Sequence, residues 1–248
     1  MRRFEKKRVV ITGGGSGIGE AAVARFAREG ARVFIVDRDG AQARRVAEAH
    51  GCAHGVADVS RSEEVTAVFE AIDSALGGVD VLINNAGVSI RATLLETTMD
   101  QWRRTMGTNV DGVFFVAVEA AKRMQQAGGG AIVNVGSVSG LVGFPIYGAY
   151  CASKAAVIEL SRCLALELAP RIRVNALCPG YVMTPMQRAE YTEEMFAECV
   201  AKIPLKRLAS PDEIAALMAF LASEEASFIT GQAIVSDGGE MAGGLASA

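Results

Sequence analysis

Long apolar runs are missing from this chain of 248 residues, although half of its residues are apolar. The longest strongly apolar stretches, such as 113–118 and 214–222, are far shorter than the ~18 residues that mark a membrane-spanning helix. The N-terminus carries basic residues but lacks the apolar core of a secretory signal peptide. We therefore expect no contact with membranes, and the apolar content excludes a disordered chain.

Charge of either sign is not in large excess either. The chain has 25 Lys and Arg residues against 28 Asp and Glu residues, which gives a net charge of −3. Because the basic residues are scattered along the sequence, we expect no surface for nucleic acid or anionic lipid.

Cysteines are few, odd in number and without a CxxC pair, which argues against a disulfide framework in a chain of this length. The five are Cys52, Cys151, Cys163, Cys178 and Cys199. This usage favours a reducing compartment, and we expect the cytoplasm. His50 and His54 flank Cys52, but no fourth ligand accompanies them, so we expect no metal site.

Short apolar runs alternate with helical patterns along the whole chain. The runs are continuous, which is typical of strands covered on both faces in a parallel sheet. Expected strands are 8–12, 32–37, 52–57, 79–83, 131–136, 172–177 and 232–236, and expected helices are 18–29, 40–49, 61–76, 99–127, 150–168 and 211–222. Because no linker interrupts this alternation, we predict one doubly wound α/β domain over residues 1–248, with a parallel sheet of about seven strands.

Two segments near the C-terminus have distinct signals. Residues 179–204 hold no expected strand, and a loop of this length is often a functional lid. One or two short helices packed on the core would explain the same segment. The helix expected at 211–222 has clear start signals, because Ser210 is a suitable N-cap, Pro211 takes the first helical position and Glu213 completes a capping box.

A glycine-rich turn follows the first expected strand. Gly13, Gly17 and Gly19 form a GxxxGxG pattern between that strand and the next helix, and the more common GxGxxG spacing does not occur there. Glycines allow a tight turn with positive φ and let a phosphate approach the backbone. The N-terminus of the following helix offers N–H groups and a positive dipole end to a pyrophosphate. The context of strand, turn and helix predicts a dinucleotide site.

The second expected strand ends at Asp37, which lies about twenty residues beyond the glycines. An acid at this place accepts hydrogen bonds from the ribose hydroxyls of an adenosine, and it repels a 2′-phosphate. Arg38 follows directly and would serve a 2′-phosphate. Since repulsion at contact distance is hard to offset, Asp37 favours NAD over NADP.

Tyr150 and Lys154 are four residues apart at the start of an expected helix, so both lie on one face. A nearby ammonium favours tyrosinate and lowers the pKa of a phenol. Such a tyrosine is a general base for alcohol oxidation and a general acid for carbonyl reduction. Ser137 lies at the end of an expected strand, where ligands bind in sheets of this kind.

Together these motifs resemble the short-chain dehydrogenase/reductase family over nearly the whole chain. In the family's order, the sequence carries the glycine pattern, Asp37, Asn84-Asn85-Ala86-Gly87, Asn109, Ser137, Tyr150 with Lys154, Pro179-Gly180, Thr230-Gly231-Gln232 and Asp237-Gly238-Gly239. Each motif is weak alone, but the order and spacing are specific. Gly136 departs from the serine that the family often has there, which removes nothing from the expected mechanism. The resemblance implies a Rossmann-type fold, a nicotinamide cofactor and hydride transfer.

The resemblance also implies roles for the matching residues. Tyr150 would transfer the proton, Lys154 would lower its pKa and hold the nicotinamide ribose, and Ser137 would orient the substrate oxygen. Asn109 would hold a water that links Lys154 to solvent. The implied cofactor site comprises Gly13, Ser16, Gly17, Ile18, Gly19, Asp37, Arg38, Asp58, Val59, Asn85, Ala86, Gly87, Tyr150, Lys154, Pro179, Gly180, Val182 and Thr184, with Asp58 and Val59 at the adenine.

Substrate-pocket candidates follow from the same resemblance of position. They are Ser137, Ser139, Phe144, Tyr147, Tyr150, Tyr181, Met183 and Met186, with Ser89 and Arg91 as further members. Tyr147 is followed four residues later by Cys151 rather than a lysine, so we expect it to line the pocket and not to transfer a proton. Arg91 would suit an acidic substrate or form a surface ion pair.

These observations predict an NAD-dependent oxidoreductase that interconverts a secondary alcohol and a ketone, with Tyr150 as general acid and base. Two alternatives stay open: an NADPH-dependent 3-oxoacyl thioester reductase of the same family, and a non-catalytic nucleotide-binding regulatory protein on the same fold. The intact set of Ser137, Tyr150 and Lys154 argues against the second. From the resemblance alone, we expect a homotetramer, or a dimer, formed through the helices at 99–127 and 150–168 and through the region of the C-terminal strand.

Overall fold

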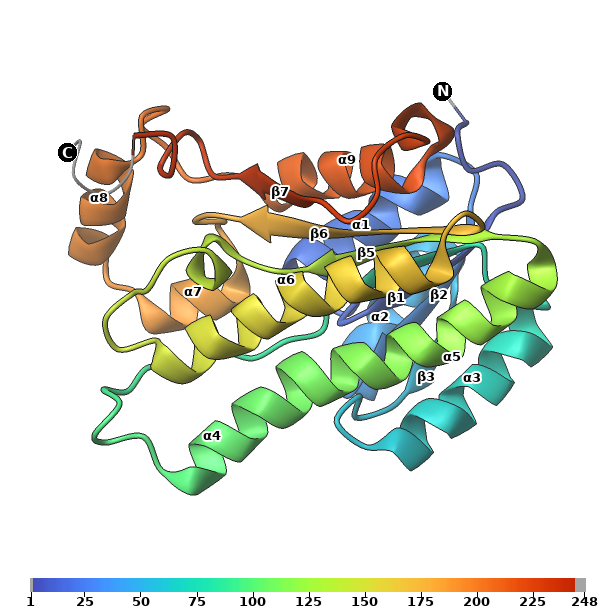
Figure 1. Ribbon diagram of the computed structural model, residues 1–248, viewed down its shortest axis with the longest axis horizontal. Helices are drawn as coiled ribbons and strands as arrows, with labels where there is room; N and C mark the ends of the chain where they lie inside the picture. The colour runs from blue at the N-terminus through green and yellow to red at the C-terminus, as the bar shows by residue number, and fades with distance from the viewer. Residues whose placement is uncertain (1, 244–248) are drawn as a thin grey trace.

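Seven strands pair in parallel in the computed structural model, which describes residues 2–243 apart from the side chains of Met186 and Glu190 (Figure 1). The strands are β1 (Arg8–Thr12), β2 (Arg32–Asp37), β3 (Ala53–Val56), β4 (Val81–Asn84), β5 (Gly130–Val135), β6 (Ile172–Pro179) and β7 (Ala233–Ser236). Their order across the sheet is β3-β2-β1-β4-β5-β6-β7. The chain reverses direction across the sheet between β1 and β4, so the doubly wound topology predicted from the sequence is confirmed.

Helices cover both faces of this sheet. They are α1 (Gly17–Arg28), α2 (Gly40–His50), α3 (Ser62–Leu76), α4 (Met99–Met106), α5 (Gly112–Ala127), α6 (Gly148–Leu168), α7 (Pro185–Glu190), α8 (Glu193–Lys202) and α9 (Pro211–Ala222). α1, α2 and α9 share one apolar cluster with one face of the strands, and α3, α5 and α6 share a second cluster with the other face (Figure 1).

The central strands show why their apolar runs are continuous. On β1, the side chains of Val9 and Ile11 join the cluster under α1, whereas Val10 joins the cluster under α3 and α5. Successive side chains of a strand point to opposite faces of the sheet. Because helices cover both faces, all three side chains are fully buried. Such a strand needs apolar residues at every position, which is the pattern that the sequence shows.

One long helix expected at 99–127 is divided in the structure. α4 ends at Met106, a π-helical segment, η1, covers Gly107–Asp111, and α5 begins at Gly112. The segment contains the buried Asn109, and a π-helical turn accommodates one extra residue without leaving the helix axis. The predicted helical stretch at 99–127 is confirmed, and the π-helical turn within it was not predicted, because a single wider turn leaves the apolar periodicity on either side almost unchanged.

Several predicted strand ends also differ from the structure. β4 begins two residues later than expected, and β6 continues to Pro179, where Pro179 is the register partner of Ser236 on β7. The segment after β6 contains the short helices α7 and α8, which confirms the prediction of short helices for residues 179–204. Both helices lie beyond the carboxyl ends of the strands (Figure 1). Within residues 2–243, no helix is both long and apolar enough to cross a membrane.

The predicted start of α9 is confirmed in detail. The Ser210 side chain accepts a hydrogen bond from the N–H of Glu213, and the Glu213 carboxylate accepts one from the N–H of Ser210 at 2.9 Å. Two N–H groups that the helix itself leaves unpaired are thereby satisfied.

Replacing Ser210 by alanine should lower the free energy of unfolding by about 1 kcal/mol, because the N–H of Glu213 loses the hydroxyl acceptor and keeps only the carbonyl oxygen of residue 210. Urea unfolding followed by circular dichroism measures this loss. Ser227→Ala, at an exposed serine that follows the helical turn Glu224–Ala226, is the matched control. Equal effects of the two substitutions would contradict the assigned cap.

Candidate active site

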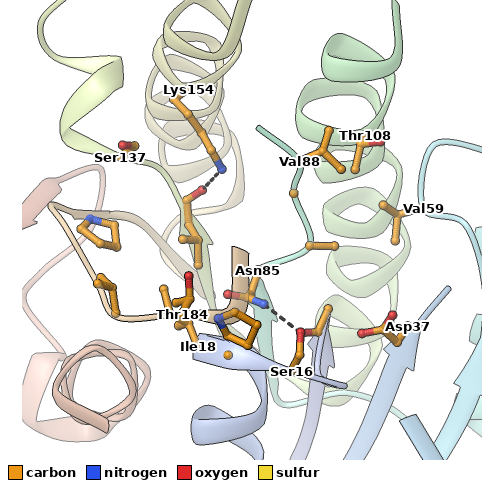
Figure 2. Close-up of a pocket in the computed structure, with 18 of the residues that line it drawn as sticks. Ser16, Ile18, Asp37, Val59, Asn85, Val88, Thr108, Ser137, Lys154 and Thr184 are labelled. Carbon is orange, nitrogen blue, oxygen red and sulfur yellow. Dashed lines mark hydrogen bonds between the residues drawn. The ribbon is translucent and has the colours of Figure 1, made fainter. Parts of the chain in front are cut away.

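A cavity of about 340 Å³ lies at the carboxyl ends of the strands, and a second one of about 100 Å³ adjoins it. Figure 2 shows the larger cavity, with Asp37 and Val59 toward one end and Ser137 and Lys154 toward the other. Ligands of doubly wound sheets bind at this edge, where the strand order reverses. The volume of the larger cavity falls in the range of small-molecule and cofactor sites.

The glycine turn forms the floor of the larger cavity. Gly13 and Gly17 have φ angles of 65° and 56°, values that other residues rarely adopt. Gly19 does not line the cavity, and a Cβ atom there would overlap the carbonyl oxygen of Gly13. The first two glycines therefore shape the turn, and the third lets α1 pack closely against it.

The N-terminus of α1 opens into this cavity. Ser16 is the N-cap residue of α1, but its side chain makes no capping hydrogen bond. The first N–H groups of an α-helix have no partner within the helix, and the helix dipole places partial positive charge there. Ser16, Gly17 and Ile18 all line the cavity, so this end of α1 is suited to a phosphate group.

A small set of hydrogen bonds ties the glycine turn to the end of β4. The Thr12 hydroxyl accepts from the N–H groups of Asn85 and Ala86, both at 3.0 Å. The Asn85 amide donates to the carbonyl oxygen of Thr12 at 3.0 Å and to that of Gly13 at 3.2 Å. Two neighbouring strand ends are thereby fixed relative to each other.

Asp37 lies where β2 ends, as its spacing from the glycines predicts. Its carboxylate accepts from the N–H of Gly15 at 2.9 Å and from the N–H of Asp39 at 3.0 Å. These two bonds fix the carboxylate at the cavity wall beside Arg38. Each oxygen keeps further acceptor capacity, so the group can accept hydrogen bonds from vicinal ribose hydroxyls.

Lys154 is buried on α6, and its ammonium donates to the carbonyl oxygen of Val135 at 2.8 Å (Figure 2). Burial lowers the pKa of this ammonium to about 8, because the charged form loses its hydration. The Lys154 Nζ atom lies 5.6 Å from the centre of the Tyr150 ring. The predicted pair is thus brought together on one face of α6.

Ser137 follows β5 and begins the short helical turn η2 (Val138–Gly140). Its hydroxyl oxygen accepts a hydrogen bond from the N–H of Ser139 at 3.1 Å, which leaves the hydroxyl proton for another acceptor. Ser137 and Tyr150 line both cavities. A ligand oxygen at the junction of the cavities would therefore lie between a hydroxyl donor and a phenol.

Asn109 does not line either cavity and is fully buried. Its side chain accepts from the N–H of Val88 at 2.8 Å, and donates to the carbonyl oxygen of Val88 at 2.9 Å and to the Ser153 hydroxyl at 3.0 Å. The amide thus fixes the cavity-lining Val88 to α6. A water held between Asn109 and Lys154 stays a prediction.

The second cavity is lined by aromatic rings and small polar groups. The Tyr147 and Tyr191 hydroxyls are 2.9 Å apart and hydrogen-bonded. The Arg91 guanidinium lies over both of these rings, 5.8 Å and 5.1 Å from their centres, and does not line the cavity itself. Arg91 therefore supports the aromatic wall.

The structure brings most of the predicted site residues together. The larger cavity is lined by Gly13, Ser16, Gly17, Ile18, Asp37, Arg38, Asp58, Val59, Asn85, Ala86, Gly87, Ser137, Tyr150, Lys154, Pro179, Gly180, Val182 and Thr184. The second is lined by Ser89, Ser137, Ser139, Phe144, Tyr147, Tyr150 and Tyr181 from the predicted set. Met183 lines neither cavity, and the Met186 side chain lies outside what the structure describes.

Sequence reasoning missed several lining residues. They are Val36, Ala57, Val88, Thr108, Val135, Gly136, Pro185 and Gln187 in the larger cavity, and Val138, Gln187 and Tyr191 in the second. Many of them adjoin residues that the motifs had already singled out, so position at a strand end was a usable signal. Gln187 and Tyr191 had no such signal, because they belong to α7 and its C-terminal end.

Comparison with known proteins agrees with this geometry. Residues 13–240 match the family model described as enoyl-(acyl carrier protein) reductase. The chain is 42% identical over 244 residues to a meso-2,3-butanediol dehydrogenase of Serratia marcescens, which covers 97% of this chain and 96% of that protein. It is 37% identical over 246 residues to an NADP-dependent (R)-specific alcohol dehydrogenase of Lentilactobacillus kefiri, covering 96% and 97%.

Two further likenesses extend this comparison. The chain is 40% identical over 243 residues to the 3-oxoacyl-(acyl-carrier-protein) reductase FabG of Thermotoga maritima, covering 96% of this chain and 98% of that protein. The crystal structure of gox2181 superposes with a TM-score of 0.93 at 34% identity, covering 97% of each chain.

This chain of 248 residues belongs to the short-chain dehydrogenase/reductase family. It is an oxidoreductase of that family, as the motifs predicted.

The residues present fit a nicotinamide dinucleotide. The helix end at Ser16 is suited to the pyrophosphate, the Asp37 carboxylate to an adenosine ribose, and the Lys154 ammonium to the second ribose. Among the described residues, no group of three or more His, Cys, Asp or Glu side chains could hold a metal ion.

Lys154 should make the stability of the free protein depend on pH. Its folded-state pKa of about 8 lies below the value of about 10.4 of a lysine in an unfolded chain. Between these values the unfolded chain binds more protons, so the free energy of unfolding should rise with pH. Compared with Lys154→Met, the wild type should therefore gain stability from pH 7.5 to pH 10.

Urea unfolding at both pH values measures this gain. The same substitution at Lys122, which is exposed on α5, serves as the control. If the free energies of unfolding of the wild type and Lys154→Met differ by the same amount at both pH values, the assignment of a buried ammonium to Lys154 is contradicted.

Proposed function

We propose that this protein is an NAD-dependent dehydrogenase that interconverts a small secondary alcohol and the corresponding ketone. The observation that carries the proposal is the position of Ser137 and Tyr150 at the junction of the two cavities, with Lys154 buried beside them. A protein that only bound nucleotide would not need a proton-transfer group at that junction.

The chain's residues position the substrate and move one proton. Ser137 donates its hydroxyl proton in a hydrogen bond to the substrate oxygen, since its own oxygen already accepts from Ser139. Tyr150 takes the hydroxyl proton of the alcohol during oxidation and returns it during reduction. The positive charge of Lys154 favours the phenolate form of Tyr150. The nicotinamide supplies the acceptor or donor of the hydride that leaves or enters the carbinol carbon.

The preference for NAD rests on Asp37. Its carboxylate is held at the cavity wall by two backbone N–H groups, so it cannot easily turn away from a ligand. A 2′-phosphate placed there would meet a fixed negative charge, whereas two ribose hydroxyls would find acceptors. Arg38 lines the same wall and favours the phosphate, which makes Asp37 the residue on which the preference depends.

The second cavity also favours small substrates over acyl thioesters. At about 100 Å³, its volume suits a substituent of a few non-hydrogen atoms better than an acyl chain with its carrier arm. The likeness to a 3-oxoacyl reductase nevertheless makes such thioesters the necessary comparison in a substrate panel. Turnover should be measured with secondary alcohols, ketones and 3-oxoacyl thioesters, each with NAD(H) and NADP(H).

Other parts of the chain have proposed roles of a more general kind. The chain would act as a single dinucleotide-binding and catalytic domain, in which residues 179–204 form a substrate lid, because α7 contributes to both cavities. A homotetramer is supported by exposed apolar side chains on α5 and α6, such as Phe114 and Leu166, which are 45% and 83% exposed. Five free cysteines support a place in the cytoplasm.

Tyr150→Phe should keep cofactor binding and lose turnover, because the ring stays in place while the transferable proton is removed. We expect kcat to fall at least about 100-fold, the smaller end of the range for loss of a general acid or base. Nicotinamide absorbance measures turnover, and quenching or enhancement of NADH fluorescence measures binding. Turnover close to that of the wild type would overturn the proposed mechanism.

Asp37→Ala should narrow the ratio of kcat/KM with NAD to that with NADP, since the substitution removes both the ribose acceptor and the repulsion. The matched control is Asp39→Ala, which removes a nearby charge that caps α2 and does not line the cavity. If the ratio is the same in wild type and Asp37→Ala, the cofactor preference must come from other residues.

A further inference from the structure

Gln187 carries a polar atom whose hydrogen-bonding capacity is unused in the described part of the chain. Its side-chain oxygen Oε1 is withdrawn from solvent and has no hydrogen-bond partner there. Leaving a buried amide oxygen unpaired is unfavourable by roughly 1–3 kcal/mol. Such an atom in a native structure calls for an explanation, and a ligand that supplies the missing donor is one.

The position of Gln187 is fixed by its backbone. Its N–H donates to the Thr184 hydroxyl at 3.3 Å, and its carbonyl oxygen accepts from the N–H of Tyr191 at 3.0 Å. Both bonds belong to the ends of the short helix α7. The side chain therefore leaves a well-defined place on α7, and it lines both cavities.

Among the residues that the structure describes, four are common to the two cavity linings: Ser137, Tyr150, Gly180 and Gln187. Ser137 and Tyr150 are the groups that would hold the reacting oxygen. Gly180 has no side chain, and a Cβ atom there would press on Asp237. Gln187 is thus a further side chain, besides Ser137 and Tyr150, that lies where the two cavities meet.

The size of the second cavity suits a short substituent beyond the reacting carbon. A cavity of about 150 Å³ encloses a benzene molecule, and this one measures about 100 Å³. The space suits a substituent of a few non-hydrogen atoms. Its wall includes Ser139 and the hydrogen-bonded hydroxyls of Tyr147 and Tyr191, so the cavity offers polar surroundings to a polar substituent.

We propose that Gln187 recognises a second hydroxyl group on the carbon adjacent to the reacting one, so that the preferred substrates are short vicinal diols and the matching hydroxyketones. This inference rests on the proposed function. On binding, the Gln187 side-chain amide turns toward the cavity, so that the diol hydroxyl donates to Oε1 while the reacting oxygen is held by Ser137 and Tyr150. A monoalcohol of the same length leaves that oxygen unpaired and is bound less well.

The test compares 2,3-butanediol with 2-butanol, using purified full-length protein and saturating NAD. The wild type should favour the diol in kcat/KM. Gln187→Met has nearly the same length and no acceptor oxygen, and it should lose about tenfold in kcat/KM for the diol, mainly through KM. Its kcat/KM for 2-butanol should change little, because that alcohol makes no bond to Oε1.

Two further variants make the comparison specific. Gln126→Met places the same substitution on the exposed face of α5 and should behave as the wild type with both alcohols. Gln187→Glu keeps acceptor oxygens at the same chain length and should retain most of the diol preference. This variant keeps the proposal testable if Gln187→Met does not fold.

The outcomes separate this inference from the proposed function. If the wild type has the same kcat/KM for both alcohols, the role of Gln187 is overturned and the proposed function is not affected. The same follows if Gln187→Met keeps the diol preference, or if Gln187→Glu loses it. Absence of turnover by the wild type with either alcohol, and with either of the corresponding ketones and NADH, overturns the proposed function and the inference together.

Discussion

The parallel pairing of the strands is the constraint on which the rest of the molecule depends. Because every strand points the same way, the residues that follow β1, β2, β4, β5 and β6 all meet at one edge of the sheet. Short hydrogen bonds then join neighbouring ends, as between Thr12 and Asn85. Once the strands pair, the register of the sheet fixes the relative positions of the residues that form the site.

The same edge combines stability with an unfavourable charge. The ammonium of Lys154 is buried and held by one carbonyl oxygen at the end of β5, and its lowered pKa shows the unfavourable free energy of that position in the free protein. Well-packed clusters on both faces of the sheet offset this. Function thus takes advantage of a rigid scaffold that tolerates a poorly solvated group where a ligand is to be bound.

Much of the fold and site could be predicted from the sequence, and the reasons are local. Gly13 and Asp37 were found because each lies at a fixed distance from an apolar strand, and Tyr150 with Lys154 because the helical repeat places them on one face. The π-helical segment at Gly107–Asp111 was missed because an added residue in one turn hardly disturbs the apolar pattern. Gln187 was missed because Ser137 and Tyr150, with which it lines both cavities, lie far away in the chain, so only tertiary packing shows that Oε1 is enclosed.

The placement of Gln187 on α7 has an evolutionary consequence. α7 has six residues and lies outside the sheet, so its side chains can be exchanged without altering strand pairing or the buried clusters. Ser137 and Lys154, by contrast, depend on β5 and α6 for their positions. Lineages of this scaffold can therefore diverge in the molecules they accept through changes in one short surface helix, while the inherited chemistry at the sheet edge is preserved.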